Sequence, residues 1–302
     1  MNANGTPKPH DRAGIALGLL AYLFWGVLPI YFKLVEVQPP TDIVAHRVVW
    51  SLPLLGLLII LSRSWRTVQR AIAHRRTIGM LVLTALLIAA NWLLYVHAVT
   101  RGHILAASFG YYLNPLANVL LGRFVLHERL ERRQWIAVGI AAAGISVLAL
   151  GALSQLWISL LLCATFATYG LLRKIVAADA VTGLAIETAI LFPVAALWLA
   201  WRHAQGGAVM GSNETVTVLL LLAGLVSTTP LLLFTAAAKR LQLSSLGMLQ
   251  FIAPTLQFLI AVLLYSEHFT IAHAIAFPAI WIALALYVTV LLRRPQLPQP
   301  PE

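Results

Sequence analysis

Two charged side chains interrupt long apolar stretches of this 302-residue sequence and could carry out chemistry there. Arg47 lies about five residues inside the apolar run 42–62, and Glu187 about six residues inside the run 181–201. A charge at such depth in an apolar environment costs about 2.5–3.5 kcal/mol, so it usually faces a cavity or a partner. A planar guanidinium suits the binding of a carboxylate, and a carboxyl group at depth can exchange a proton.

Each of these side chains has an alternative role that the sequence leaves open. Arg47 either clamps a substrate anion or extends toward the nearby end of its apolar run. Glu187 is either a proton-coupling group or a structural one, as a polar tie between helices or in a fixed ion pair for which Arg47 is a candidate partner. His46 occupies the position that matches Glu187 in the other half of the chain, so it is a second proton-coupling candidate.

Amide and aromatic side chains add further candidates inside the apolar runs. Asn91 and Asn114 could hydrogen-bond a substrate or hold neighbouring helices together. The aromatic residues could line a pocket for amphiphilic solutes, or could form an interfacial belt and pack the helices. The candidate substrate-binding residues are Trp25, Arg47, Asn91, Tyr95, Tyr111, Asn114 and Gln250.

Prolines and acidic residues at matching positions of the two halves are predicted to have structural roles, as helix kinks and helix caps. Pro115 and Pro254 each remove a backbone hydrogen bond in the middle of an apolar run, so we predict hinges or packing kinks there. Glu128 and Glu267 each follow a run and precede the next. An acid favours a helix N-terminus, so both are predicted to cap the helix that follows them.

The composition places these residues in a membrane-spanning helical protein. The chain is 60% hydrophobic and only 10% charged, whereas soluble domains carry about 25% charged residues. The apolar runs are continuous over about 20 residues, which predicts helices that cross a membrane and not alternating β-barrel strands. The ten predicted spans are 13–33, 42–62, 77–98, 104–126, 134–151, 155–172, 181–201, 216–236, 244–265 and 272–292.

The basic residues predict how these spans are oriented. With the N-terminus inside, seventeen of the 21 Lys and Arg residues, Arg173 among them, fall on the inner side, and only Lys33, Arg101 and Arg202 fall on the outer side. Such a bias is typical of cytoplasmic loops, so both termini are predicted to be cytoplasmic. This topology puts Arg47 near the outer side and Glu187 near the inner side.

The halves of the chain resemble each other. Residues 95–128 align without a gap to residues 234–267, with the same order of helix end, basic turn, proline-containing helix and acidic end. The matched spans start on opposite sides, so the two five-helix units are inverted, an arrangement of many secondary transporters. The predicted divisions are a tail at 1–12, repeats at 13–151 and 152–292, and a tail at 293–302.

Other classes of function find little support in the sequence. The net charge of +11 lies in short loops between apolar runs, where it sets topology and contacts anionic lipid, so nucleic acid is not an expected partner. We find no phosphate-binding loop, nucleophile motif or metal-ligand spacing, and Cys163 is the single cysteine. No catalytic residue, metal or cofactor is therefore predicted.

A set of short motifs, in order, resembles the RarD branch of the EamA-type drug/metabolite transporter superfamily. The motifs are GxxxYxxWGxxPxYxK at 18–33, HRxxWS at 46–51, NWxxY at 91–95, SxGYxxNPL at 108–116, PLxLFxxAA at 230–238 and GxLQFIAPTxQF at 247–258. The resemblance covers nearly the whole chain outside the tails. It implies a ten-helix inverted-repeat carrier of the inner membrane that exports small molecules.

The residues and the resemblance together predict a secondary transporter of small metabolites or drugs, such as amino acids or amphiphilic compounds. The predicted direction of transport is export. Its expected partners are a small-molecule substrate, membrane lipid and, as a candidate coupling ion, the proton. A monomer and a homodimer are both left open. The alternatives are a membrane scaffold or sensor that transports nothing, and an intramembrane enzyme.

Overall fold

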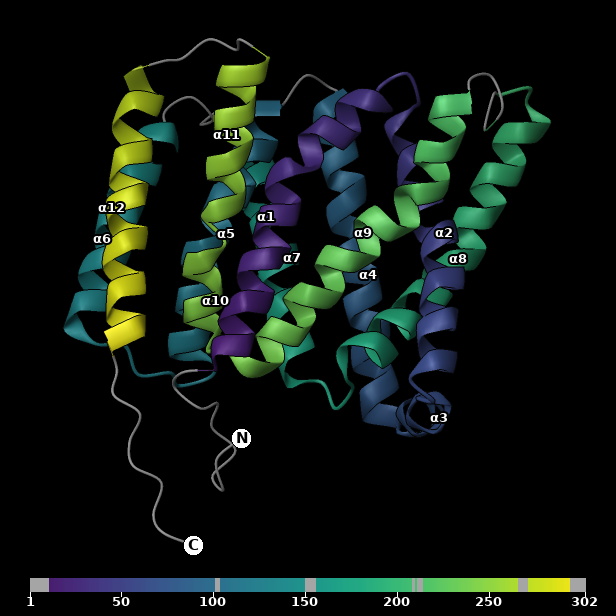
Figure 1. The fold of residues 1–302 in the computed structure, drawn as a ribbon, viewed down its shortest axis with the longest axis horizontal. Coiled ribbons are helices and arrows are strands. Elements are labelled where there is room, and N and C mark those ends of the chain that lie inside the picture. Colours follow the sequence, from purple (N-terminus) through teal and green to yellow (C-terminus); the bar gives the residue numbers. More distant parts are fainter. Residues whose placement is uncertain are drawn as a thin grey trace, which may run out of the picture.

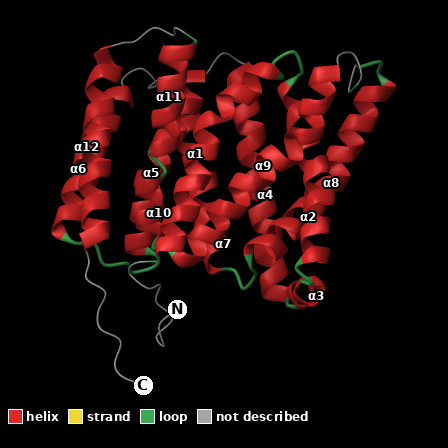
Figure 2. Ribbon diagram, viewed as in Figure 1, coloured by secondary structure: helices red, strands yellow, loops and turns green. Residues whose placement is uncertain are grey.

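The computed structural model describes residues 11–100, 104–149, 156–207, 210, 214–265 and 271–293. Within these ranges every regular element is a helix, and no strand occurs (Figure 2). The prediction of an all-α protein is confirmed. Helices are expected here because an apolar solvent requires each backbone group to find its hydrogen-bond partner within the chain.

Nine long helices and three short ones follow one another in the described ranges. The helices are α1 (Arg12–Leu34), α2 (Pro40–Leu61), α3 (Trp65–Ala73), α4 (Arg75–Thr100), α5 (Ile104–Phe124), α6 (Arg132–Ala149), α7 (Leu156–Ile175), α8 (Ala180–Ala204), α9 (Glu214–Arg240), α10 (Leu243–Leu249), α11 (Ile252–Leu264) and α12 (Ile271–Arg293). The short helices α10 and α11 follow each other directly and together match one predicted span.

Eight of the described segments are long and apolar enough to cross a membrane. They are α1, α2, α4, α7, α8, α9, the α10–α11 pair and α12. The long helices α5 and α6 are not among the eight. Large apolar side chains such as Ile60, Val194 and Leu197 are more than two-thirds exposed, as expected of faces that contact lipid. A multi-pass membrane protein is thus supported, and ten spans remain a prediction.

The long helices run side by side, and the short α3 lies across one end of them (Figure 1). In pairwise contacts, α2 packs on α8, α6 on α12 and α5 on α10. Helix α1 packs on α9 and α11, and α4 packs on α7. Segments from the two halves of the chain therefore alternate through the molecule.

Side chains at the helix ends account for several boundaries. Asp11 accepts a hydrogen bond from the Gly14 amide at the start of α1, and Asp179 accepts one from the Thr182 amide at the start of α8. These are ordinary N-caps, which stabilise a helix by satisfying an otherwise unpaired donor. At the C-terminal end of α9, the Lys174 ammonium donates hydrogen bonds to two carbonyls. One is that of Ala238 in the last turn, and the other is that of Leu241, which directly follows the helix.

The Glu128 carboxylate caps a helix, but not the one predicted. It accepts hydrogen bonds from the Leu243 amide (2.6 Å), the Ser244 amide (3.0 Å) and the Ser244 hydroxyl (2.6 Å). It therefore caps α10 in the second half of the chain, and not α6, which follows it in sequence. Because four helices, α6 to α9, intervene, sequence order alone could not identify this partner. Glu267 lies outside the described residues.

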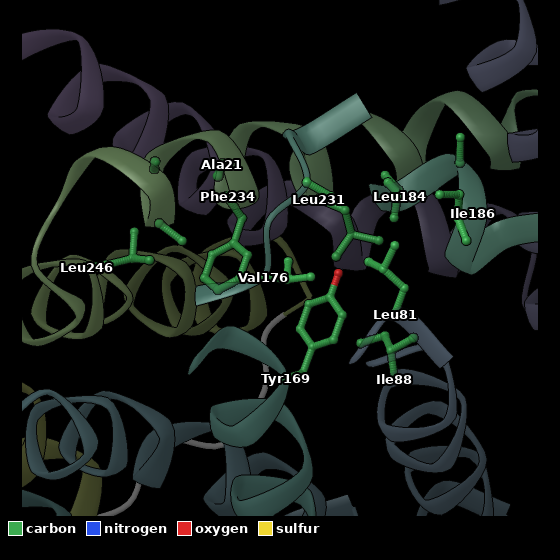
Figure 3. Packing of buried hydrophobic residues seen from close by; sticks show 14 of the residues in the cluster. Ala21, Leu81, Ile88, Tyr169, Val176, Leu184, Ile186, Leu231, Phe234 and Leu246 are labelled. Carbon is green, nitrogen blue, oxygen red and sulfur yellow. The ribbon is translucent and has the colours of Figure 1, made fainter. Parts of the chain in front are cut away.

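The apolar core centres on contacts between α1, α4, α7, α8 and α9. Figure 3 shows the Tyr169 ring within this core, with its hydroxyl directed among Leu81, Leu184 and Leu231. Tyr169 is fully buried. A buried tyrosine hydroxyl usually has a hydrogen-bond partner, and here that partner is a charged group in a cavity.

Candidate functional site

A small, largely enclosed cavity lies among α2, α4, α7, α8 and α9. The cavity volume is about 20 Å³, which is room for roughly one or two water molecules. The lining residues are Arg47, Val48, Ser51, Ile88, Trp92, Tyr169, Leu184, Glu187, Thr188, Leu191, Ser227, Thr228 and Leu231. Both charged residues singled out in the sequence therefore face the same space, although they are predicted to lie near opposite membrane faces.

Arg47 is held in this cavity by α9 and by aromatic rings. Its Nε donates to the Ser227 hydroxyl at 2.6 Å. Its guanidinium carbon lies 4.6 Å from the centre of the Trp92 ring and 5.9 Å from that of Phe32, both within cation–π range. Arg47 makes no ion pair with any described residue, so its charge is balanced here by aromatic faces and a hydroxyl and not by a carboxylate.

Glu187 is buried on the opposite wall, about two turns into α8. Its Oε1 accepts a hydrogen bond from the Thr84 hydroxyl at 2.5 Å, and its Oε2 accepts one from the Tyr169 hydroxyl at 3.3 Å. Arg173 Nη1 lies 3.5 Å from Oε1. The carboxylate thus connects α4, α7 and α8 while one side of it faces the cavity.

The ionic partner of Glu187 corrects the candidate named from the sequence. The pair forms with Arg173 and not with Arg47, because the α7–α8 turn brings residues 173 and 187 together. Arg173 is fully buried, and its Nη2 donates to the Ala180 carbonyl at 3.2 Å. A side chain at Gly183 would overlap the guanidinium, so this glycine makes room for it. Arg173 therefore does not belong with the basic loop residues.

His46 is buried but is not among the residues that line the cavity. Its Nδ1 accepts a hydrogen bond from Trp50 Nε1 at 3.1 Å, one turn along α2. The matched position in the second half, Glu187, does face the cavity. Within the described residues the two proton-coupling candidates therefore occupy different surroundings.

Asn91, Tyr95 and Tyr111 form a polar and aromatic connection beside the cavity. Asn91 Nδ2 donates to the Leu162 carbonyl (3.0 Å) and the Thr165 hydroxyl (2.9 Å), and its Oδ1 accepts from the Tyr111 hydroxyl (3.3 Å). The ring centres of Tyr95 and Tyr111 are 5.8 Å apart. Asn91 thus ties α4 to α7 and α5, which is the structural alternative considered above, and none of the three lines the cavity.

Trp25 belongs to an aromatic cluster and not to the cavity wall. Its ring centre lies 5.8 Å from that of Tyr22, 5.9 Å from that of Phe166 and 5.5 Å from that of Phe234. The cluster joins α1 to α7 and α9. Trp92 is the tryptophan that does face the cavity.

Asn114 and Gln250 lie in a second buried polar group, where α5 crosses α10. Gln250 Oε1 accepts a hydrogen bond from Asn118 Nδ2 at 3.1 Å. Asn114 is fully buried, and neither atom of its amide has a hydrogen-bond partner in the described part of the chain. Asn118 was not a candidate, although its position one turn after Asn114 places it on the same helix face.

The two hinge candidates differ in structure. Helix α5 runs unbroken through Pro115, whereas the matching segment is interrupted between α10 and α11. Pro254 has no amide hydrogen to donate to the carbonyl four residues earlier, that of Gln250, which is where α10 has ended. The helix break is therefore present in one half only, and the hinge role of both prolines stays a prediction.

The arrangement defines a polytopic helical protein with a charged cavity enclosed by helices from both halves of the chain. Comparison with known proteins assigns it to a family. A model of the EamA-like transporter family matches residues 12–150. The chain belongs to this family, and its relatives place it in the RarD branch.

Two relatives illustrate the match over nearly the whole chain. An "Uncharacterized transporter" of Vibrio cholerae is 45% identical over 284 residues, covering 93% of this chain and 94% of that protein. "Protein RarD" of Escherichia coli K12 is 44% identical over 287 residues, covering 92% of this chain and 95% of that protein. The resemblance stated from the motifs is thereby confirmed.

More distant comparisons agree with the fold. A "Chloramphenicol-sensitive protein RarD" of Pseudomonas aeruginosa is 33% identical, covering 90% of this chain and 92% of that protein. A solved structure titled "Crystal structure of protein" matches with a TM-score of 0.71 and 18% identity, covering 94% of this chain and all of that chain. At that identity, the structural match speaks for the fold alone.

Proposed function

We propose that the protein is a secondary transporter of the inner membrane that exports small anionic solutes by alternating access. The observation that carries the proposal is the small, largely enclosed cavity in which Arg47 has no carboxylate partner among the described residues. A cavity with room for one or two waters is too small for a metabolite. Its helices must therefore separate, first on one side and then on the other, for a solute to pass.

Ten spans in two inverted repeats, 13–151 and 152–292, provide the means for that motion. The pairwise contacts support the proposal, because exchanging the halves turns α1 on α9 into α7 on α4, while α2 on α8 and α6 on α12 remain unchanged. The matched positions Arg47 and Thr188 both line the cavity. In transporters of this build the site lies between the repeats, which rock about it.

The chemistry of the cavity indicates the class of substrate. Arg47 offers a positive charge, and the Trp92 ring offers an apolar face beside it. A carboxylate would compensate the charge through its hydrogen bonds, and an apolar or aromatic body would contact the ring. The expected substrates are therefore small amphiphilic solutes that carry a carboxylate, among them amino acids and anionic drugs.

Glu187 is the proposed site of proton coupling. It faces the cavity and is held by two hydroxyl donors and by Arg173. Protonation would leave Arg173 without its counter-charge in a buried place, which is costly. Proton uptake would therefore favour a different packing of α7 and α8. The N-in, C-in orientation, which places Glu187 toward the cytoplasm, follows from the basic loops even after Arg173 is removed from the count.

Transport assays in proteoliposomes test the proposal. Labelled anionic, zwitterionic and cationic solutes of similar size are offered to the purified protein with and without a pH gradient. We expect uptake of anionic solutes above that of protein-free vesicles, and loss of that uptake on Arg47→Gln. A preference for cations would contradict the substrate class. No uptake of any solute by folded protein would favour a scaffold or sensor.

A further inference from the structure

Helix α3 is an element that transport does not explain, and the ten-span prediction contains no place for it. It occupies Trp65–Ala73, between the ends of α2 and α4. Figure 1 shows it end-on, lying across the lower ends of the spanning helices. The turn before it includes Arg63 with a φ of 52°, a left-handed conformation that is unusual for a residue with a side chain. The chain thus turns sharply to place this helix.

The two sides of α3 differ in chemistry. Val68 and Ala71 are buried against α4 and α8. Trp65 and Ile72 flank this buried side and are 62% and 53% exposed. Arg66 and Arg70, one turn apart, lie on the other side of the helix and are exposed. A helix with one apolar side and one basic side at the end of membrane spans is typical of an element that lies in the membrane interface.

The charge around α3 is of one sign. Arg63, Arg75 and Arg76 flank the helix and are also exposed, and none of these arginines forms an ion pair with a described residue. The sequence contains no acidic residue between Asp42 and Glu128. By contrast, the basic segment 129–133 contains Glu131 and directly follows Glu128. The arginines of this surface therefore form no ion pair within the described residues, and together they attract an external anion.

We propose that α3 binds the headgroup of an anionic phospholipid, with Arg66 and Arg70 on its phosphate and Trp65 and Ile72 against its acyl chains. Guanidinium groups bind phosphate through paired hydrogen bonds, and tryptophan favours the membrane interface. A lipid is the occupant that this arrangement favours, because the charged and apolar side chains sit together at the ends of apolar helices. The proposal does not depend on which solute the protein transports.

Lipid binding to the purified full-length protein tests the proposal. Native mass spectrometry compares phosphatidylglycerol with phosphatidylcholine for the wild type, for Arg66→Gln/Arg70→Gln and for the matched control Arg132→Gln/Arg133→Gln. An arginine near an anionic surface contributes about 1 kcal/mol, so we expect about thirtyfold weaker phosphatidylglycerol binding in the first variant. The control variant and the binding of phosphatidylcholine should change little.

Two results would overturn the proposal. They are equal binding of the two lipids by the wild type, and unchanged phosphatidylglycerol binding in the Arg66→Gln/Arg70→Gln variant. Displacement of the lipid by inorganic phosphate alone would reassign the site to free phosphate. A second readout uses fluorescence quenching by brominated phosphatidylglycerol, which should be smaller in Trp65→Phe than in the wild type. That comparison tests the contact between Trp65 and the lipid even if the double variant does not fold.

Discussion

Arg173 Nη1 and Glu187 Oε1 lie 3.5 Å apart with both side chains almost completely removed from solvent. The pair joins the end of α7 to α8 about two turns after its start, and its carboxylate faces the same cavity as Arg47. The cavity is thus bounded by a compensated charge on one wall and an uncompensated one on the other. This asymmetry is the basis of the predictions about the site.

The stability of the fold should depend on the Arg173–Glu187 pair as a unit. Removing one partner of a buried pair leaves an uncompensated charge, which typically costs about 3–5 kcal/mol. We therefore expect Glu187→Gln to lower the melting temperature, and the double variant Arg173→Met/Glu187→Gln to recover much of the loss. The exposed pair Lys33–Glu36 is the control, with a coupling below about 1 kcal/mol. Strictly additive effects of Arg173→Met and Glu187→Gln would contradict the coupling.

The Glu187→Gln variant should also distinguish proton coupling from solute binding. Glutamine keeps an amide oxygen and nitrogen for Thr84 and Tyr169 but cannot ionise. Uptake driven by a pH gradient should therefore be lost, while exchange of labelled for unlabelled solute across the membrane continues. The measurement is uptake in proteoliposomes under both regimes, corrected for the amount of folded protein. Gradient-driven uptake that persists in the variant would assign Glu187 a structural role only.

Arg47→Gln should weaken solute binding without weakening the fold. A hydrogen bond to a charged group contributes about 1.5–3 kcal/mol, so we expect the KM for an anionic solute to rise about tenfold or more. Because Arg47 has no ionic partner among the described residues, its removal should leave the melting temperature unchanged or raised. Arg133→Gln, an exposed change of the same kind, is the control. A large loss of stability with unchanged KM would make Arg47 structural.

Glu128→Ala should destabilise the packing of α10 on the first half of the chain. This carboxylate accepts three hydrogen bonds from donors at the start of α10. Loss of a helix cap costs about 0.5–2 kcal/mol, and the buried amides of Leu243 and Ser244 would then have lost this acceptor. Thermal unfolding should show a loss near the upper end of that range. Glu36→Gln, at an exposed pair, should change little, and equal effects of the two variants would contradict the cap.

Close contact between α2 and α9 should make Gly224 sensitive to substitution. A methyl group there would collide with the backbone of Trp50 in α2, whereas a methyl group at Gly139 in α6 would meet no described atom within 4 Å. Gly224→Ala should therefore lower the melting temperature by an amount equivalent to about 1–3 kcal/mol. Gly139→Ala should be neutral or stabilising, because alanine favours helices. Similar effects at both positions would rule out a tight α2–α9 contact.

Much of the fold could be predicted from the sequence because apolar runs of about 20 residues define helices by length and composition. The predicted limits of the runs at 42–62 and 181–201 agree closely with α2 and α8. Helix α3 was missed because its nine residues are too few and too basic to resemble a span. The break between α10 and α11 was placed only approximately, since Pro254 indicates lost hydrogen bonding but not the residue at which the helix ends.

The site was predictable where depth in an apolar run was the signal. Arg47 and Glu187 were found in this way and line one cavity. Arg173 was missed because it follows an apolar run directly before Lys174, where a pair of basic residues usually marks a loop. The signals that could have found it are the short turn to α8 and the space at Gly183. The hydrogen-bond partner of Glu128 could not be predicted from the sequence, because only the tertiary fold brings residue 243 to it.

Access to the cavity from each side of the membrane tests the central claim most directly, and it requires no knowledge of the substrate. Thr188 lines the cavity and Cys163 is buried, so Thr188→Cys is introduced with Cys163→Ser. Membrane-impermeant maleimide is then added to right-side-out and to inside-out vesicles. Alternating access predicts labelling from both sides, with little labelling of the wild-type Cys163. Labelling from one side only, or from neither, in folded protein would contradict the account.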